Sequence, residues 1–270
     1  MFVSPMLLHS IKEPFNDDSY ITELKFDGIR LILSKFNDQI KLFTRHNNEV
    51  TSKFPELLDL DIPNGTVLDG EVIVAARDGA ADFEAMMERF MSKKSNHSIV
   101  YCVFDVIFKN GDSIAAKPLS ERKNLLYSLN LIHPNVYVIE GIKGNASEYF
   151  NLTKEKNLEG IVLKRADSPY EINKRSRNWL KVINYEYTEV LITGYTKEDI
   201  KFLISYPDGS SAGFMEFMPY EERSKFHSMK QVKSESDEYV FIDPIVCKVK
   251  HRFKTKHGKL RIPSFESWRA

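Results

Sequence analysis

The stretch ELKFDGIRLILSKF, residues 23–36, combines a β-type apolar run with a cluster of charged residues. Lys25, Asp27 and Arg30 interrupt the run, and Gly28 lies among them. Side chains alternate along a strand, so Lys25 and Asp27 are expected to share one face. Gly28 would let the backbone pass close to a ligand. Arg30 supplies a rigid fork of donors that suits a phosphate or ribose oxygen.

A lysine at a strand end is ordinarily a solvated cation, and a nucleophilic lysine needs a neutral amine. The reference pKa of about 10.4 leaves roughly one lysine in 2,500 neutral at pH 7, a difference of about 4.6 kcal/mol. Desolvation and neighbouring cations lower that pKa. The Lys-x-Asp-Gly-x-Arg pattern around Lys25 therefore suits covalent capture of a nucleotidyl group.

The composition is that of a soluble globular protein with one large domain or two smaller ones. The 270 residues are 42% hydrophobic and 28% charged, and 38 basic residues balance 38 acidic ones. Nucleic-acid binding must therefore come from local basic stretches, for which residues 172–181 and 248–261 are the candidates. Cys102 and Cys247 are expected to be small buried hydrophobes. The chain shows no secretion signal and no apolar membrane span, so we expect a cytoplasmic monomer.

The pattern along the chain predicts an α+β fold with mainly antiparallel sheets. Strands are predicted at residues 20–26, 29–36, 40–44, 66–75, 99–108, 136–140, 160–164 and 179–183. Helices are predicted at residues 82–91, 118–129 and 146–156, the second with Ser120 as its N-cap. From about residue 187, five short strands and one helix predict a small OB-type β-barrel. The expected domains are residues 1–186 and 187–270.

An ordered series of motifs resembles the covalent nucleotidyltransferases, and within them the ATP-dependent DNA ligases. KFDGIR at Lys25 resembles the adenylation motif of that family. Further similar segments follow in the family's order across nearly the whole chain: TRHNNEVTSKFPEL at Thr44, LDGEVIV at Leu68, YCVFDVIF at Tyr101, EGIVLK at Glu159, WLKV at Trp179 and LRIPSFESWR at Leu260. The resemblance implies an adenylation (nucleotidyltransferase) domain followed by an OB-fold domain.

The resemblance also implies a role for each matching residue. Catalytic roles fall to Lys25, Asp27 and Lys181, with Asp27 acting mainly in the sealing step. Glu71 and Glu159 would bind a divalent metal, Mg²⁺ or Mn²⁺, and the ribose of ATP. The other expected contacts to ATP or DNA are Glu23 at the base edge, Phe104 stacked on adenine, Arg30, Lys164 and Lys181 at phosphate or ribose, Arg45 at the 5′-phosphate of the nick, and Arg261.

The implied activity is the ATP-dependent sealing of nicks in duplex DNA, in repair, replication or recombination. Lys25 would take AMP from ATP, the AMP would pass to the 5′-phosphate of the nick, and the 3′-hydroxyl would then displace it. Nicked duplex DNA is the expected partner, and an end-joining recruiter is a further candidate. Catalysis of this kind depends on positioning and charge neutralisation.

Two departures from the family pattern concern the first step. The fifth motif usually reads Lys-x-Lys, but Ile183 stands at the second lysine position here. The sixth motif usually continues to an Asp-Lys pair, whose role would fall to Arg261 and Arg269. We therefore expect slow self-adenylation, with the sealing of a pre-adenylated nick less affected.

Other functions share parts of this pattern. An mRNA-capping guanylyltransferase shares Lys-x-Asp-Gly-x-Arg, but its fourth motif differs from EGIVLK. An RNA ligase usually lacks the matching barrel and sixth motif, and NAD-dependent ligases normally lack the arginine found at Arg30. A weakly active or non-catalytic protein that binds nicks or ends is the alternative from a different class.

Overall fold

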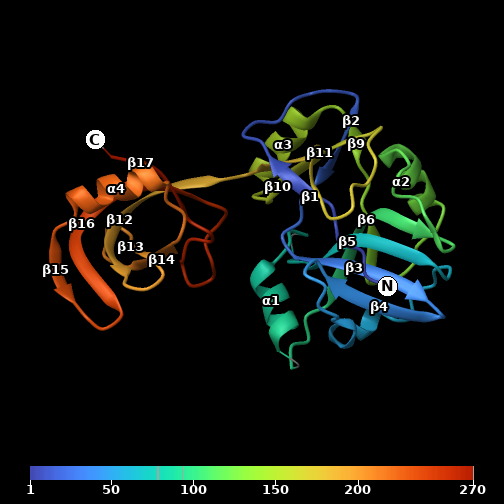
Figure 1. The fold of residues 1–270 in the computed structure, drawn as a ribbon, viewed down its shortest axis with the longest axis horizontal. Helices are drawn as coiled ribbons and strands as arrows, with labels where there is room; N and C mark the ends of the chain where they lie inside the picture. Colours follow the sequence, from blue (N-terminus) through green and yellow to red (C-terminus); the bar gives the residue numbers. More distant parts are fainter. Residues whose placement is uncertain (78, 93, 270) are drawn as a thin grey trace. The chain divides into compact units, whose positions relative to one another are not determined.

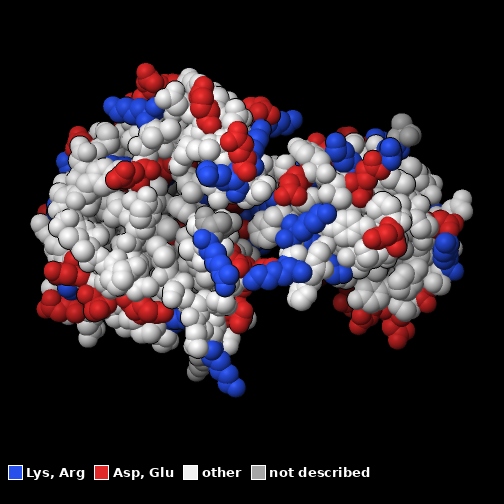
Figure 2. Space-filling model, turned by 180° about the vertical axis from the view of Figure 1, so that it is seen from behind, with Lys and Arg blue, Asp and Glu red and all other residues white. Residues whose placement is uncertain are grey.

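The computed structural model describes residues 1–77, 79–92 and 94–269. The chain divides into two compact units, of which the first is Met1–Asn184 and the second begins at Tyr185. The division falls two residues before the boundary expected from the sequence. Among the described helices, none is long and apolar enough to cross a membrane. Charged side chains of both signs are visible on each unit (Figure 2).

The first unit contains two sheets, labelled in Figure 1. One has the strand order β1 (Leu7–Ser10), β11 (Arg175–Ile183), β10 (Gly160–Arg165), β2 (Tyr20–Leu24) and β9 (Ile142–Lys143). The other has the order β4 (Gln39–Thr44), β3 (Ile29–Phe36), β5 (Thr66–Val74), β6 (Ile99–Lys109) and β7 (Asp112–Ser113), with β8 (Val136–Val138) also paired to β6. Pairing is antiparallel except for β1 with β11 and β6 with β8. The mainly antiparallel α+β prediction is therefore confirmed.

Helices cover the sheets of the first unit. They are α1 (Phe83–Met91), α2 (Leu119–Tyr127) and α3 (Ala146–Glu155), with short 3₁₀ turns at Thr51–Lys53 and Pro55–Leu57. In Figure 1, α2 lies beside β6 and α3 beside β10, and these pairs are in contact.

The predicted N-cap role of Ser120 is wrong. Helix α2 begins at Leu119 after Pro118, so Ser120 is already helical. The N–H of Leu119 donates to the carbonyl of Ser168, and the N–H of Ser120 donates to the carbonyl of Ala166. Neighbouring backbone thus satisfies two of the donors that a capping side chain would otherwise serve. By contrast, Asp82 caps α1 by accepting from the N–H of Ala85.

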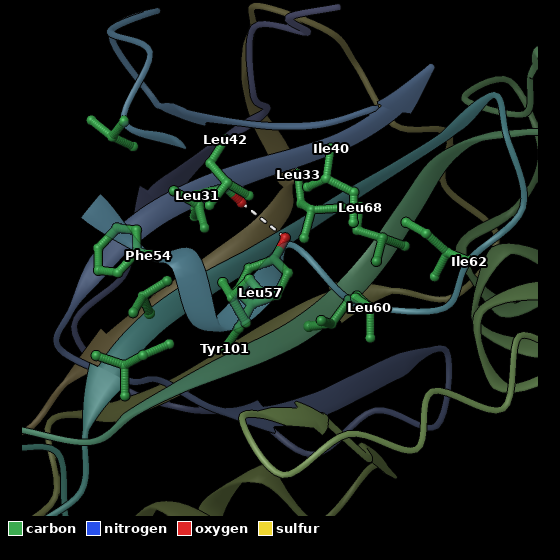
Figure 3. Packing of buried hydrophobic residues seen from close by; sticks show 14 of the residues in the cluster. Leu31, Leu33, Ile40, Leu42, Phe54, Leu57, Leu60, Ile62, Leu68 and Tyr101 are labelled. Atoms are coloured by element: carbon green, nitrogen blue, oxygen red, sulfur yellow. Dashed lines mark hydrogen bonds between the residues drawn. The ribbon is translucent and has the colours of Figure 1, made fainter. Parts of the chain in front are cut away.

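The strand that ends the opening stretch is buried on both faces. Leu31 and Leu33 of β3 belong to one apolar cluster, which is shown in Figure 3. Ile32, between them, points into a second cluster that includes Phe104 and Trp179. Alternating side chains of β3 therefore pack into two different apolar clusters. The second cluster borders the candidate site.

The second unit is one antiparallel sheet with a single helix among its described residues. Its strands are β12 (Glu186–Thr196), β13 (Phe202–Ser205), β14 (Ser211–Met215), β15 (Val232–Glu235), β16 (Tyr239–His251) and β17 (Ser264–Trp268), and its helix is α4 (Tyr220–Met229). The order is β14-β13-β12-β16-β15, with β17 also paired to β16. Register shifts in all five pairings curl the sheet into a half-barrel consistent with the expected OB fold.

This unit has six strands rather than the expected five. Strand β15 is exposed along its whole length, so it carries no apolar alternation that would reveal it. Phe226 of α4 belongs to the core of this unit: it is fully buried and packs edge-on against Phe202 with ring centroids 5.0 Å apart.

A very short connection joins the two units. Strand β11 ends at Ile183 and β12 begins at Glu186, which leaves Asn184 and Tyr185 between them. The N–H of Asn184 donates to the carbonyl of Glu159 at 2.8 Å.

Candidate active site

Lys25 lies immediately beyond the end of β2. The strand stops at Leu24, two residues earlier than predicted, and the N–H of Lys25 donates to the carbonyl of Gly160 at 3.0 Å. Its Nζ is 2.8 Å from Oε2 of Glu159, and both side chains are largely buried, at 16% and 4% exposure. Pairing of β2 with β10 thus brings the two family motifs together.

The predicted strand alternation of Asp27 with Lys25 is wrong, and Gly28 has a structural role that was not predicted. Asp27 follows the end of β2, so strand alternation with Lys25 does not apply there. A Cβ added to Gly28 would lie 2.2 Å from the carbonyl oxygen of Val72. The close approach of the chain to β5 therefore requires glycine at position 28.

Six of the predicted residues line one cavity: Glu23, Lys25, Arg30, Glu71, Phe104 and Lys164. The same cavity is lined by Leu8, Val162, Ile139 and Trp179, which the sequence did not single out as site residues. The arrangement joins residues of both sheets of the first unit, since β2, β10 and β11 supply one wall and β3, β5 and β6 the other. A cavity with apolar walls and a few charged groups is typical of a small-molecule site.

Phe104 of β6 lies at a bulge. In the pairing of β5 with β6, Asp69 is opposite Asp105 and Gly70 is opposite Val103, so Phe104 is the extra residue. Phe104 shares a core cluster with Cys102, whereas Val103 between them belongs to the other cluster, so regular alternation along β6 points Phe104 to the cavity side. The ring of Phe104 lies 4.5 Å from the Arg30 guanidinium carbon and 4.2 Å from Nζ of Lys164. A base stacked on this ring would therefore lie close to both cations.

Glu71 is a buried carboxylate with a raised pKa. Burial raises its pKa to about 7, and the nearby carboxylates of Glu159 and Asp27 add to the rise, while Lys25 and Arg30 oppose it. A divalent cation would relieve this crowding of negative charge. Glu71 and Glu159 suit a cation such as Mg²⁺, which keeps several water or phosphate ligands. The part of the chain that the structure describes holds no larger group of three or more potential metal ligands.

Arg30 makes a fork-to-fork pair with Asp69. Its Nε and one terminal nitrogen donate to the two oxygens of Asp69, each at 2.6 Å. Asp69 also accepts from the hydroxyl of Tyr170 at 2.6 Å. These donors of Arg30 thus face protein rather than the phosphate or ribose oxygen for which they were predicted. Asp69 stands two residues before Glu71 in the third motif, so the sequence could have suggested it as a site residue. No pattern in the sequence marks Tyr170 as a partner of this pair.

Lys164 pairs with Glu23. Its Nζ is 2.6 Å from Oε2 of Glu23, and it lies over the rings of Phe104 and Trp179. Burial lowers the pKa of Lys164 to about 8. Oε1 of Glu23 is 2.5 Å from Nζ of Lys123, a residue that sequence reasoning missed. Lys123 lies in a Glu-Arg-Lys turn that reads as an exposed helical face, so no local pattern signals its burial.

The remaining predicted residues lie elsewhere. Arg45 is exposed just after β4, where its Nε donates to His46 at 3.1 Å. Lys181 lies in β11 opposite Val162 and is not among the residues lining the cavity. Arg261 belongs to the second unit, where its guanidinium lies 5.2 Å from the ring of Phe253.

Ile183 shows what replaces the second lysine of the fifth motif. Its side chain is buried, and it is opposite Gly160 in the pairing of β10 with β11. Gly160, in turn, accepts the hydrogen bond from the N–H of Lys25. An apolar residue therefore fills the position beside the backbone of Lys25 where a cation was expected.

With the fold and this cavity described, comparison with known proteins establishes the family. The family model described as "ATP dependent DNA ligase domain" matches residues 5–182. The chain therefore belongs to the ATP-dependent DNA ligase family, and ATP is the nucleotide that the family implies.

Individual relatives agree with this assignment. The chain is 84% identical over 269 residues to the SPbeta prophage-derived DNA ligase-like protein LigB of Bacillus subtilis (strain 168), and the match covers 100% of each chain. Among solved structures, it resembles a Lig E DNA ligase with a TM-score of 0.72 at 20% identity, covering 99% of this chain and 100% of the other. It also resembles a structure of mycobacterial DNA ligase D complexed with ATP and MES, with a TM-score of 0.63 at 23% identity, covering 99% of this chain and 95% of the other. At these identities the structural matches establish the fold.

Proposed function

We propose that this protein is an active ATP-dependent DNA ligase that seals nicks in duplex DNA through AMP bound covalently to Lys25. The observation that carries the proposal is the pairing of Lys25 with Glu159 in a cavity that also holds Glu71 and Phe104. A lysine nucleophile, acidic groups and an aromatic wall are the parts that nucleotidyl transfer requires.

The first step forms a bond between Nζ of Lys25 and the α-phosphorus of ATP. The bond from that phosphorus to the bridging oxygen breaks, pyrophosphate leaves, and the amine proton passes to solvent. Glu71 and Glu159 would hold Mg²⁺ or Mn²⁺, which supplies charge neutralisation at the phosphate oxygens. Phe104 would stack on adenine, Glu23 would meet the base edge, and Lys164 and Lys181 would contact phosphate or ribose, whereas Arg30 would remain paired with Asp69.

In the second step, an oxygen of the 5′-phosphate at the nick attacks the AMP phosphorus, and the P–N bond to Lys25 breaks. In the third step, the 3′-hydroxyl attacks the 5′-phosphate, AMP leaves, and the hydroxyl proton passes to solvent. Asp27 would act mainly in this sealing step, and Arg45 would hold the 5′-phosphate. Arg261 of the second unit would contact the nucleotide in the first step.

DNA binding would come from basic residues of the second unit. In the basic stretch, residues 248–261, Lys248 lies 5.1 Å from the ring of Tyr187, and Lys250 lies 5.5 Å from the ring of Tyr185. Cations held on aromatic side chains suit backbone binding and base stacking without sequence preference.

The test is incubation with ATP labelled at the α-phosphate, followed by denaturing electrophoresis. Wild-type protein should give a labelled band at 31.3 kDa. Lys25→Ala should give none, and Lys12→Ala, which removes an exposed lysine, should label normally. The same incubation with labelled GTP separates a ligase from a capping-type enzyme, since the ligase should discriminate against GTP.

A non-catalytic protein that binds nicks or ends is the second candidate. The residue that favours it is Ile183. The fifth motif therefore contributes one lysine, Lys181, for contact with phosphate instead of the usual two. If wild-type protein takes up no label and also fails to join DNA that already carries AMP, while still binding nicked duplex, this second function is correct.

A further inference from the structure

A buried lysine outside the family motifs lies behind the cavity. Lys123 of α2 is only 3% exposed. Its Nζ donates to the carbonyl of Ile139 at 2.8 Å and lies 2.5 Å from Oε1 of Glu23. Burying an ammonium group is costly unless it is paired and hydrogen-bonded. Both of its partners, Glu23 and Ile139, line the cavity, whereas Lys123 does not.

The carboxylate of Glu23 therefore forms ion pairs with two lysines, one at each oxygen. Lys164 is on Oε2 and Lys123 on Oε1. Burial alone would raise the pKa of Glu23, but the two ammonium groups outweigh it and hold the pKa below its ordinary value. An ionised carboxylate can only accept hydrogen bonds, and each of its oxygens accepts more than one. Glu23 thus retains capacity to accept from a ligand.

The two lysines differ in what a ligand can do to them. Lys164 lines the cavity and lies over Phe104 and Trp179, so a bound nucleotide will contact or displace it. Lys123 stands behind the wall and is anchored at Ile139. It is therefore the cation that stays with Glu23 when Lys164 moves.

We propose that Lys123 is a positioning residue that holds Glu23 as an ionised acceptor for the 6-amino group of adenine, and so selects ATP over 6-oxo purine nucleotides. The inference rests on the function proposed above. Adenine presents an amino donor at this position, whereas guanine and hypoxanthine present a carbonyl acceptor. A carboxylate facing that carbonyl leaves two acceptors opposed, and a site built to receive a donor discriminates strongly against a ligand that lacks it.

The experiment compares self-adenylation with ATP against the analogous reaction with inosine triphosphate, which carries an oxygen at position 6. The ratio of the two kcat/KM values is measured for wild type and Lys123→Met. We expect the preference for ATP to fall by about tenfold or more in the variant. Lys117→Met removes an exposed lysine just before the same helix and should leave the ratio unchanged. Lys123→Arg, which keeps the charge, should retain more of the preference than Lys123→Met.

Each outcome separates the inference from the proposed function. If wild type forms no covalent nucleotide with ATP, the proposed function fails. If wild type and Lys123→Met both react and the ratio does not change, the role of Lys123 is overturned. Circular dichroism checks folding, and Lys123→Gln, which keeps a donor for Ile139, replaces the methionine variant if that variant unfolds. In a Glu23→Gln background, Lys123→Gln should not lower the ratio further; an additional fall would contradict action through Glu23.

Discussion

The Nζ atom of Lys25 lies 2.8 Å from Oε2 of Glu159, although 134 positions separate the two residues in the chain. The contact follows from the register of β2 and β10, in which Leu24 is opposite Ile161. The carboxylate of Glu159 is therefore in direct contact with the amine of the proposed nucleophile.

Replacement of Glu159 by Gln should abolish most self-adenylation. The variant loses the ion pair and one of the two carboxylates that would hold the divalent cation, and loss of a comparable electrostatic group costs about 10²-fold or more in rate. Single-turnover labelling with ATP measures the effect. Glu155→Gln removes an exposed acid near the end of α3 and serves as the control. Equal rates in the two variants would contradict the role of Glu159.

Ile183→Lys restores the Lys-x-Lys pattern and should accelerate self-adenylation by about tenfold, because a charge-assisted phosphate contact is gained. Sealing of a pre-adenylated nick should change less. Since Ile183 is buried, the free energy of unfolding should fall by about 1–3 kcal/mol. Ile183→Met keeps the apolar volume and should leave the labelling rate as it is in wild type. No acceleration in the lysine variant would show that the missing cation does not limit the first step.

Arg122→Met should destabilise the first unit by about 3–5 kcal/mol, because it leaves a buried carboxylate unpaired. Arg122 and Asp105 are both fully buried, and two of the arginine nitrogens donate to the two oxygens of Asp105 at 2.9 Å each. Arg122→Met combined with Asp105→Leu should recover most of the loss. Denaturant unfolding measures all three proteins; a double variant as unstable as the single one would rule out charge imbalance as the cause.

Because of His251, the second unit should be less stable at acidic pH than at neutral pH. The side chain is buried in β16, and burial lowers its pKa below the ordinary value of about 6.5. The unfolded chain therefore binds a proton that the native chain resists, so stability declines as the pH falls below about 6.5. His251→Gln should flatten this decline, whereas His257→Gln, which alters an exposed histidine, should not. Thermal melts between pH 5 and 8 provide the measurement.

Binding to nicked duplex should weaken steeply with salt, and Lys248→Ala should reduce the slope of log K against log salt by about 0.9, the value for one phosphate contact. Lys248 is exposed and lies within the basic stretch. Lys233, whose Nζ is 2.8 Å from Asp243, offers the matched control. If Lys233→Ala lowers the slope and Lys248→Ala does not, the proposed DNA-binding surface is wrong.

Strands with a long apolar pattern were predictable, as β3 shows by matching its predicted bounds at Ile29–Phe36. The two-residue strands β7 and β9 were not, since two residues carry no period. Strand β1 was also missed, because it is only four residues long and acquires its sheet position by parallel pairing with the distant β11.

The family and its nucleotide followed from ordered motifs, and comparison with known proteins confirmed both. The contacts inside the site could not be predicted, because they depend on tertiary structure. The bulge at Phe104 depends on the pairing of β5 with β6. The burial of Lys123 depends on helix packing, whereas its neighbours in sequence suggested an exposed face. The individual roles of the site residues stay predictions.

The two-residue connection between β11 and β12 has a mechanical consequence. The N–H of Asn184 donates to the backbone carbonyl of Glu159, the residue whose side chain pairs with Lys25, and the next strand begins at Glu186. A duplex that displaced the second unit would therefore act directly on the backbone between the strand that carries Lys181 and the peptide group of Glu159.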